Sequence, residues 1–198
     1  SAGKYARMAM REDMVGMCFS GRSAAPEYGQ GPVRGSIQGS PPFCIGMPSG
    51  EGQPDFMVDF ATGMPWDEKS FAKMPEIYYR GLGLAHAANI MSGTLGGQML
   101  PEFDRQQAKF QGANQSSFYM ALAIESFVSV EDFKADMDHL MQGVSAMEPY
   151  PGAETAQLPG GLEWHREREY RRDGIPISRE AVEGLERMAQ CVGSAVPW

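Results

Sequence analysis

The sequence predicts a fold in which α-helices and β-strands share one core. Short apolar runs bounded by turn residues indicate strands, and longer segments with apolar residues at helical spacing indicate helices. The chain has 198 residues, and its 15 Met and 10 Phe residues supplement a modest number of aliphatic side chains. Because a chain of this length buries roughly 70% of its unfolded surface, we expect a folded domain.

The first third of the chain predicts a helix, a strand, a long loop and a hairpin. Residues 4–11 have a helical pattern, and residues 14–19 form an apolar run typical of a buried strand. Residues 20–42 are rich in Gly, Pro and Ser, which favours a long loop. Turn residues separate the apolar runs 43–47 and 55–59, and this arrangement predicts a hairpin.

The middle of the chain predicts a buried helix, a strand and a second helix. Residues 77–100 are the most apolar stretch and favour a buried helix. Residues 118–124 are apolar and uncharged, which predicts an interior strand. Ser129 then stands three residues before Asp132 in a capping pattern, and apolar residues recur at helical spacing up to Val144.

Two more helices are predicted after a linker rich in Pro and Gly at 149–161. Residues 162–172 alternate in charge like a solvated helix, and Ser178 caps a last helix that ends at Gly193. Because such short helices are unstable alone in water, we expect both to dock. The sequence therefore predicts two parts, a domain at 1–150 and a C-terminal linker with two helices at 151–198.

Composition and charge exclude several classes of function. The net charge of -8 and the pI near 4.9 argue against a nucleic-acid surface. Charged and polar residues interrupt the apolar stretch at 77–100, so we expect no membrane span. Three widely spaced cysteines favour buried thiols in a reducing compartment, and no spacing indicates a metal site. The chain opens without a basic and apolar leader, so we expect any targeting segment to be removed or absent.

Two motifs admit a structural explanation as well as a functional one. The run from Gly81 to His86 resembles part of a dinucleotide-binding glycine fingerprint, but its third glycine is missing. Small residues there also predict close packing of a helix on a sheet. His139 and His165 lie in polar surroundings, which leaves His86 as the histidine placed to face a ligand. No Ser, Cys or Asp stands at a spacing that suggests a catalytic relay with any of them.

Arg80 and Asp59 are candidate ligand-binding residues. A guanidinium inside an apolar helix requires an anion or carbonyl groups, and a phosphate group would serve. Asp59 follows an apolar strand, where a carboxylate either accepts from a ligand hydroxyl or stabilises the next turn. The residues alone leave both explanations of Asp59 open.

The order of the segments resembles the non-Rossmann malate/L-lactate dehydrogenase family, to which ureidoglycolate dehydrogenase and piperideine-2-carboxylate reductase also belong. The similarity extends over nearly the whole chain. It rests on loose motifs in the family's order, at residues 1–9, 14–18, 39–48, 56–62, 79–84, 90–95 and 158–177.

This resemblance implies an α+β fold with a largely antiparallel mixed sheet covered by helices, and C-terminal helices that dock outside it. It implies binding of NAD or NADP, no metal, and hydride transfer between the nicotinamide and a 2-oxo or 2-hydroxy acid. The positions that match the family's cofactor-binding residues are Ser20, Arg22, Asp59, Phe60, Ala61, Arg80, Gly160 and Gly161.

The sequence also departs from the family. The family's acid/base histidine lies in a histidine-phenylalanine-glycine motif upstream of the position that matches Ser1, and this sequence contains no such motif. Loss of a positioned proton donor costs about 100-fold to 10,000-fold in rate. In addition, Pro41 stands where the family has Asn, Arg80 replaces Lys, and residues 62–80 lack a long family insertion.

The sequence therefore predicts a degenerate dehydrogenase module without its N-terminal catalytic segment, acting as a non-catalytic structural or interaction subunit. We expect a protein partner or a second copy on the surface that a missing helical domain would cover. The alternative is that the chain is the cofactor-binding half of an active NAD(P)-dependent oxidoreductase completed by another chain.

Overall fold

The structure, a computed structural model, describes residues 2–22, 29, 31–36, 40–63, 66–102, 105, 109–110, 112 and 115–196. Residue contacts divide the chain into two compact units, Ser1–Gly161 and Leu162–Trp198. The first unit extends beyond residue 150, where we placed the end of the first predicted part, and includes the linker up to Gly161.

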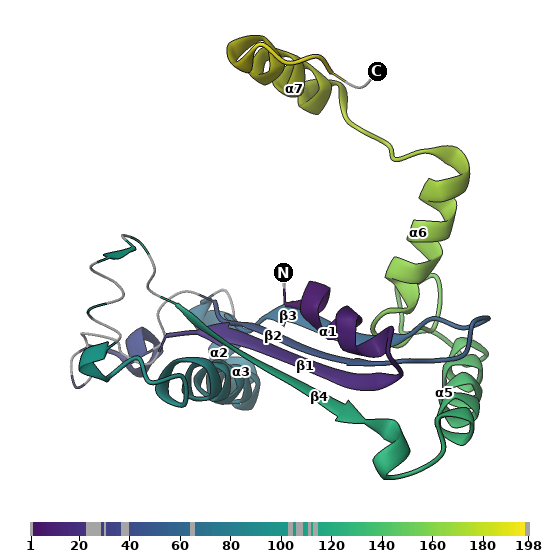
Figure 1. The fold of residues 1–198 in the computed structure, drawn as a ribbon, viewed down its shortest axis with the longest axis horizontal. Coiled ribbons are helices and arrows are strands. Elements are labelled where there is room, and N and C mark those ends of the chain that lie inside the picture. The colour runs from purple at the N-terminus through teal and green to yellow at the C-terminus, as the bar shows by residue number, and fades with distance from the viewer. Residues whose placement is uncertain are drawn as a thin grey trace. The chain divides into compact units, whose positions relative to one another are not determined.

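A four-stranded sheet forms the centre of the first unit (Figure 1). Its strands have the spatial order β3-β2-β1-β4, and all three neighbouring pairs are antiparallel, which confirms the α+β class. The predicted hairpin is confirmed as the pair β2 and β3. The strands are β1 (Met14–Gly21), β2 (Pro42–Met47), β3 (Phe56–Ala61) and β4 (Ser116–Ala123).

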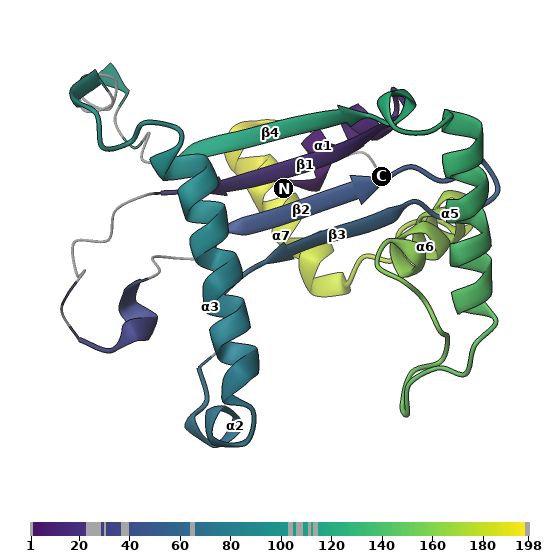
Figure 2. The same ribbon diagram turned by 90° about the horizontal axis from the view of Figure 1, so that it is seen from below.

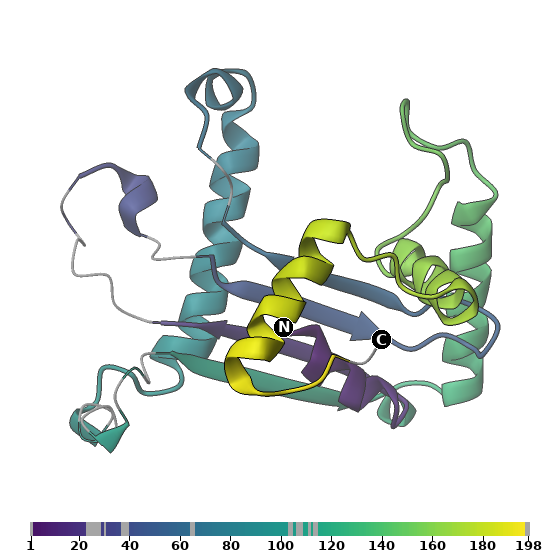
Figure 3. The ribbon, with the colours of Figure 1, turned by 90° about the horizontal axis from the view of Figure 1, so that it is seen from above.

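Helix α1 (Gly3–Met10) packs on one face of this sheet (Figure 3). Gly16 of β1 allows the close approach, because a Cβ at this position would overlap the backbone of Ala6. The main buried core lies between the helix and the sheet. It consists of Ala2, Ala6, Met10, Cys18, Cys44 and Met57.

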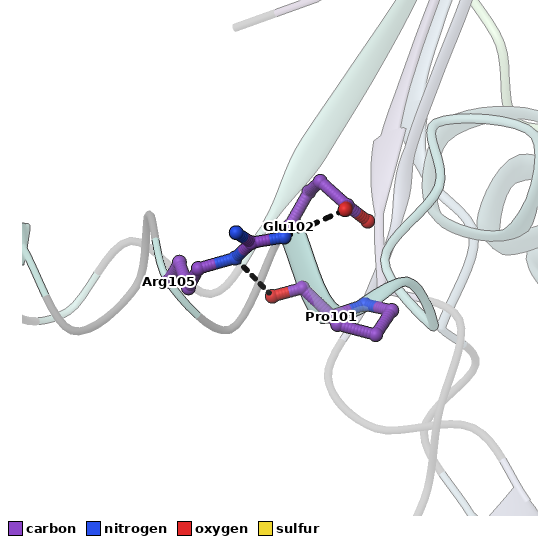
Figure 4. A network of polar contacts seen from close by, with 3 residues as sticks. All are labelled: Pro101, Glu102 and Arg105. Carbon is purple, nitrogen blue, oxygen red and sulfur yellow. Dashed lines mark hydrogen bonds and ion pairs between the residues drawn. The ribbon is translucent and has the colours of Figure 1, made fainter.

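Helix α3 (Pro75–Asn89) crosses the opposite face at one end of the sheet (Figure 2). It continues into the π-helical turn η2 (Ile90–Thr94), and the short helix α2 (Glu68–Lys73) precedes it. Beyond η2, the side chain of Arg105 donates to the carbonyl of Pro101 and pairs with Glu102 at 2.7 Å (Figure 4).

Two details of the middle segment differ from the prediction. The helix predicted at 77–100 is present, but it is not buried throughout, because Ala85 and Ala88 are buried whereas Ile77, Tyr79 and Leu84 are exposed. Gly83 does not serve close packing either, since a Cβ there would meet no atom within 4 Å.

Strand β4 is an edge strand next to β1, so the prediction of an interior strand at 118–124 is wrong. Its lack of charge has another cause. One face of β4 carries Phe118 against Phe19, and the other carries Tyr119 against Tyr5 with ring centroids 4.9 Å apart. An edge strand that packs rings on both faces has the same uncharged pattern as an interior one.

Helix α5 (Val130–Ser145) lies near the other end of the sheet and begins at the predicted cap (Figure 2). The Oγ of Ser129 accepts a hydrogen bond from the N–H of Asp132 at 3.1 Å, and Met137 and Met141 are buried. The short turns η1 (Val33–Ser36) and η3 (Ile124–Ser126) complete the described elements of the first unit.

The second unit contains α6 (Gly161–Asp173), whose first residue closes the first unit, and α7 (Arg179–Val192). Both helices end as predicted, because Gly174 and Gly193 adopt φ angles of +89° and +65°. The Oγ of Ser178 accepts from the N–H of Ala181 at 3.2 Å. The apolar stripe of α7 is exposed at Leu185, Met188 and Val192, and docking of these helices stays a prediction.

Candidate functional site

Five of the eight predicted cofactor-binding residues lie at one end of the sheet. Strands β1 and β3 run in the same direction because each pairs antiparallel with β2, so both end at the same edge. Ser20 and Arg22 stand at the end of β1, and the segment from Asp59 through Phe60 to Ala61 forms the end of β3. The fold therefore brings together two segments that are about 40 positions apart in the sequence.

The polar groups at this end make contacts within the fold. The Oγ of Ser20 donates to the carbonyl of Ser116 at 3.0 Å, and the N–H of Arg22 donates to Oδ1 of Asn89 at 3.1 Å. Oδ2 of Asp59 accepts from the N–H of Gly3 at 3.0 Å. These contacts join β1, β3 and the residue after β1 to neighbouring elements, through the side chains of Ser20 and Asp59 and through the backbone of Arg22.

Phe60 is part of a row of four phenylalanine rings on the face of the sheet that α3 crosses. Each strand contributes one ring to this row, because the strand register places the four residues opposite one another. The ring centroids are 5.6 Å, 4.8 Å and 5.8 Å apart in the order Phe60, Phe43, Phe19 and Phe118. Ala61 follows Phe60 and is exposed.

Arg80 lies in α3 and is exposed, in contrast to the expectation from its apolar neighbours. Water therefore satisfies the guanidinium, and desolvation gives no argument for a bound phosphate. The many apolar residues around Arg80 predicted a buried position. Much of this helix, however, extends past the sheet (Figure 2).

Gly160 and Gly161 lie away from the other six residues, beside the beginning of β3. The N–H of Met57 donates to the carbonyl of Pro159 at 2.9 Å, so the segment before Gly160 pairs with the strand. Gly160 has a φ of +99°, and a Cβ here would overlap the carbonyl oxygen of Asp55. Its lack of a side chain thus has a structural reason. The role of the eight residues in binding NAD(P) stays a prediction.

A cavity of about 420 Å³ lies next to the end of β3. Thr62 and Gly63 line it immediately after Ala61, and Tyr79 and Gly81 line it on either side of Arg80. None of the eight predicted residues lines the cavity. Its other lining residues are Pro32, Val33, Arg34, Trp66, Phe71, Tyr78, Leu82 and Ala85.

An aromatic cluster forms one part of the cavity wall. The ring of Trp66 lies 5.1 Å from that of Phe71 and 5.7 Å from that of Tyr78, measured between centroids. The guanidinium of Arg34 lies over the ring of Trp66 at 5.0 Å. Sequence reasoning missed this site, although a density of four aromatic residues between 66 and 79 was a signal for it.

His86 is not among the residues that line this cavity. Its Nε2 lies 2.9 Å from the Oγ of Ser36, and this hydrogen bond ties η1 to α3. His139 and His165 are exposed as expected. The histidines of the described segments therefore have a structural or a solvent-exposed setting.

Cys18 and Cys44 are buried free thiols, as predicted, whereas Cys191 is exposed. Burial removes water from the thiolate form and raises the pKa of Cys44 to about 12, with a smaller contribution from the Asp59 carboxylate. The pKa of Cys18 is raised for the same two reasons. These thiols are protonated at neutral pH and are poor nucleophiles.

Neither a metal centre nor a membrane span is found among the residues that the structure describes. No group of three or more His, Cys, Asp or Glu side chains in these segments has an arrangement suited to a metal ion. No described helix combines the length and apolar character that crossing a bilayer requires.

Known proteins of one family resemble this chain. The chain is 23% identical to malate dehydrogenase of Pyrococcus horikoshii over 97% of its own length and 63% of the relative. It is also 23% identical to L-sulfolactate dehydrogenase of Methanocaldococcus jannaschii, again over 97% of this chain and 63% of that protein. The chain thus spans less than two thirds of the length of these relatives.

Solved structures of the same kind share the fold. Malate dehydrogenase of Pyrococcus horikoshii matches with a TM-score of 0.70 at 24% identity, covering 98% of this chain and 62% of that one. Malate dehydrogenase of Entamoeba histolytica matches with a TM-score of 0.70 at 19% identity, covering 100% of this chain and 66% of that one. A family model described as malate/L-lactate dehydrogenase matches residues 66–186, which is more than half of the sequence. The chain therefore belongs to the malate/L-lactate dehydrogenase family.

Proposed function

We propose that this chain is a non-catalytic structural or interaction module of the malate/L-lactate dehydrogenase family. In this proposal it does not transfer a hydride by itself, and it assembles with another polypeptide through the face of the sheet that α3 crosses. That polypeptide corresponds to the part of the relatives' fold that this chain does not match.

One observation carries the proposal, namely an open apolar face on the part of the sheet between α3 and α5, as the exposure of its side chains shows. Figure 2 shows these two helices near opposite ends of the sheet. The side chains that alternate with the α1 core point to this face, and they are large and apolar. Phe19, in the phenylalanine row on this face, is 6% exposed, but none of the eight side chains of the open face is buried. Cys18, Cys44 and Met57 on the α1 face are at most 8% exposed. The open face consists of Val15, Met17, Ile45, Met47, Phe56, Val58, Met120 and Leu122.

Such a face favours a protein partner. A sheet with apolar side chains on both faces is normally covered on both, because exposing one face leaves apolar surface in water. The relatives have additional chain that this sequence does not match, since 37% of the malate dehydrogenase lies outside the 63% that is covered. A polypeptide of that kind is the occupant that we propose for the open face.

Site-specific photocross-linking tests the proposal. A benzophenone amino acid replaces Leu122 on the open face, and a matched control replaces Tyr119 on the other face of the same strand. In cells that naturally make this protein, we expect position 122 to cross-link to a polypeptide with the unmatched part of the dehydrogenase fold, and position 119 not to. Cross-links to a second copy would refute this partner, and a native mass that corresponds to a single polypeptide, without cross-links, would refute any partner.

A second candidate function is the cofactor-binding half of an active oxidoreductase. It is supported by the position of Ser20, Arg22 and residues 59–61 at one end of the sheet. Titration of the purified chain with NADH and NADPH, followed by nicotinamide fluorescence, tests it. Micromolar binding would support this candidate, and no signal up to millimolar concentration would refute it.

A further inference from the structure

We propose that a single α-helix of the partner polypeptide, about three turns long, covers the open face and lies across the four strands between α3 and α5. This inference rests on the proposed function, which supplies the partner, and it names the element that the partner contributes. Three observations support it, namely the arrangement of the open face in rows, the two helices beside this face, and the exposed apolar flanks of those helices.

The side chains of the open face form two rows that run across the strands. One row passes through all four strands, because the strand register pairs its members directly, and it consists of Val58, Ile45, Met17 and Met120. The other row lies two residues away along each strand, a distance of about 7 Å. A helix with its side chains is about 10 Å across, so one helix that lies along the rows covers both.

The width of the sheet sets the length of this helix. Neighbouring strands are about 4.8 Å apart, so a row across the four strands extends about 14 Å between the outer strands. A helix rises about 1.5 Å per residue, and about 10 residues therefore span the row. The relatives have ample chain for such a helix, since this chain covers only 63% of the malate dehydrogenase.

The helices on either side favour a helix over a second sheet or a loop. Both α3 and α5 run across the direction of the strands, near opposite ends of the sheet (Figure 2). Strands of a second sheet would align within about 30° of the strands below and would therefore run into both helices. A loop would place backbone N–H and C=O groups without partners on an apolar surface, whereas a helix pairs these groups internally.

Helix α3 has an exposed apolar flank on the side of the open face. Tyr79 lines the cavity next to the end of β3, and His86 contacts η1, so both belong to the flank that faces away from the open face. Ile77 and Leu84 each precede one of these residues by two positions, which is a rotation of about 200° around a helix. They are therefore on the opposite flank, and they are 37% and 38% exposed. A helix on the open face would pack against both side chains as the neighbour of α3.

Helix α5 has a similar flank at the other end of the sheet. The carboxylate of Asp138 accepts from the N–H of Gly50 at 2.7 Å, and Lys134 forms an ion pair with Asp13. This side of α5 thus faces the segments that lie beyond the strand ends. Leu140 follows Asp138 by two residues, so it points away from those segments, about 200° around the helix. It is 46% exposed, and both flanks therefore leave apolar side chains for an element between them.

Photocross-linking along one row tests the helix. In separate variants of the full chain, a benzophenone amino acid replaces Val58, Ile45, Met17 or Met120, and mass spectrometry identifies the cross-linked partner residues in cells that naturally make this protein. We expect residues of one segment of about 13 residues, which advance along the row at intervals of three or four. Several separate segments, or intervals of two, would overturn the helix and leave the proposed partner standing. No cross-link at any of the four positions would overturn both.

Two lysine variants test the contact with α3. Leu84→Lys places a charge on the flank beside the open face, and we expect it to lower the yield of cross-links from position 17 about tenfold, because burial of an unpaired ammonium is unfavourable. The matched control Gly83→Lys adds the same charge where a Cβ meets no atom within 4 Å, and it should leave the yield unchanged. Circular dichroism checks that both variants fold. An unchanged yield for Leu84→Lys, or equal losses for the two variants, would overturn the position of the helix beside α3.

Discussion

The carboxylate of Asp59 accepts a hydrogen bond from the backbone N–H of Gly3, with 3.0 Å between the two heavy atoms. Gly3 is the first residue of α1, and the side chain of the N-cap residue Ala2 offers no hydrogen bond. Asp59 therefore supplies from β3 the capping group that the helix itself lacks, and its negative charge lies at the positive end of the helix dipole. A residue that resembles a cofactor ligand thus has a role in joining helix to sheet.

We predict that Asp59→Ala lowers the free energy of unfolding by about 1–2 kcal/mol, the usual effect of losing a capping group. Asp59→Asn should lose less, because an amide oxygen still accepts from the N–H. Urea denaturation measures both, with Asp136→Ala, at an exposed position of α5, as the control. If Asp59→Ala unfolds at the same urea midpoint as the wild type, this hydrogen bond does not stabilise the fold.

Gly160 should tolerate alanine less well than Gly152. Both glycines adopt a positive φ, of +99° and +88°, so alanine at either position costs about 1–2 kcal/mol in backbone strain. A Cβ at position 152 meets no atom within 4 Å, whereas one at position 160 overlaps the carbonyl of Asp55. Thermal unfolding of Gly160→Ala and Gly152→Ala measures the difference, and equal losses of stability would contradict this account of Gly160.

The three thiols should react at two distinct rates. Cys191 is exposed, so it should react at once with Ellman's reagent in the native protein. Cys18 and Cys44 are 2% and 0% exposed and should react only after denaturation. Rapid release of three equivalents from the folded chain would show that the core between α1 and the sheet opens readily.

Stability should decline at alkaline pH because of the same two buried thiols. Their pKa values are raised in the folded state by burial, that of Cys44 to about 12, whereas an unfolded thiol ionises near pH 8.5. Between these values the native state binds more protons, so its stability falls as pH rises. Urea midpoints between pH 8 and 11 should fall less steeply for Cys44→Ala than for the wild type. If the urea midpoints of the two proteins fall equally steeply with pH, the Cys44 thiol is not a cause of the decline in stability.

Local signals in the sequence predicted most of the helices and strands correctly. The caps at Ser129 and Ser178 and the C-terminal glycines Gly174 and Gly193 act within a few residues, so a linear pattern contains them. The hairpin at 42–61 is local for the same reason. Such features depend on neighbouring residues and not on the rest of the fold.

Features that depend on distant pairing did not follow from the sequence. The edge position of β4 is set by its pairing with β1, about 100 residues earlier. The row of four phenylalanines and the exposure of Arg80 likewise depend on where strands and helices meet. The aromatic cavity combines η1 with α2 and α3, which no single segment indicates.

The activity of the purified chain tests the central claim most directly. NADH and NADPH are mixed with oxaloacetate or pyruvate, and their oxidation is followed by absorbance. We expect no oxidation above the rate in buffer, because in the proposed function this chain does not transfer a hydride by itself. Turnover by the chain alone, at a rate that rises with its concentration, would contradict the claim that it is a non-catalytic module.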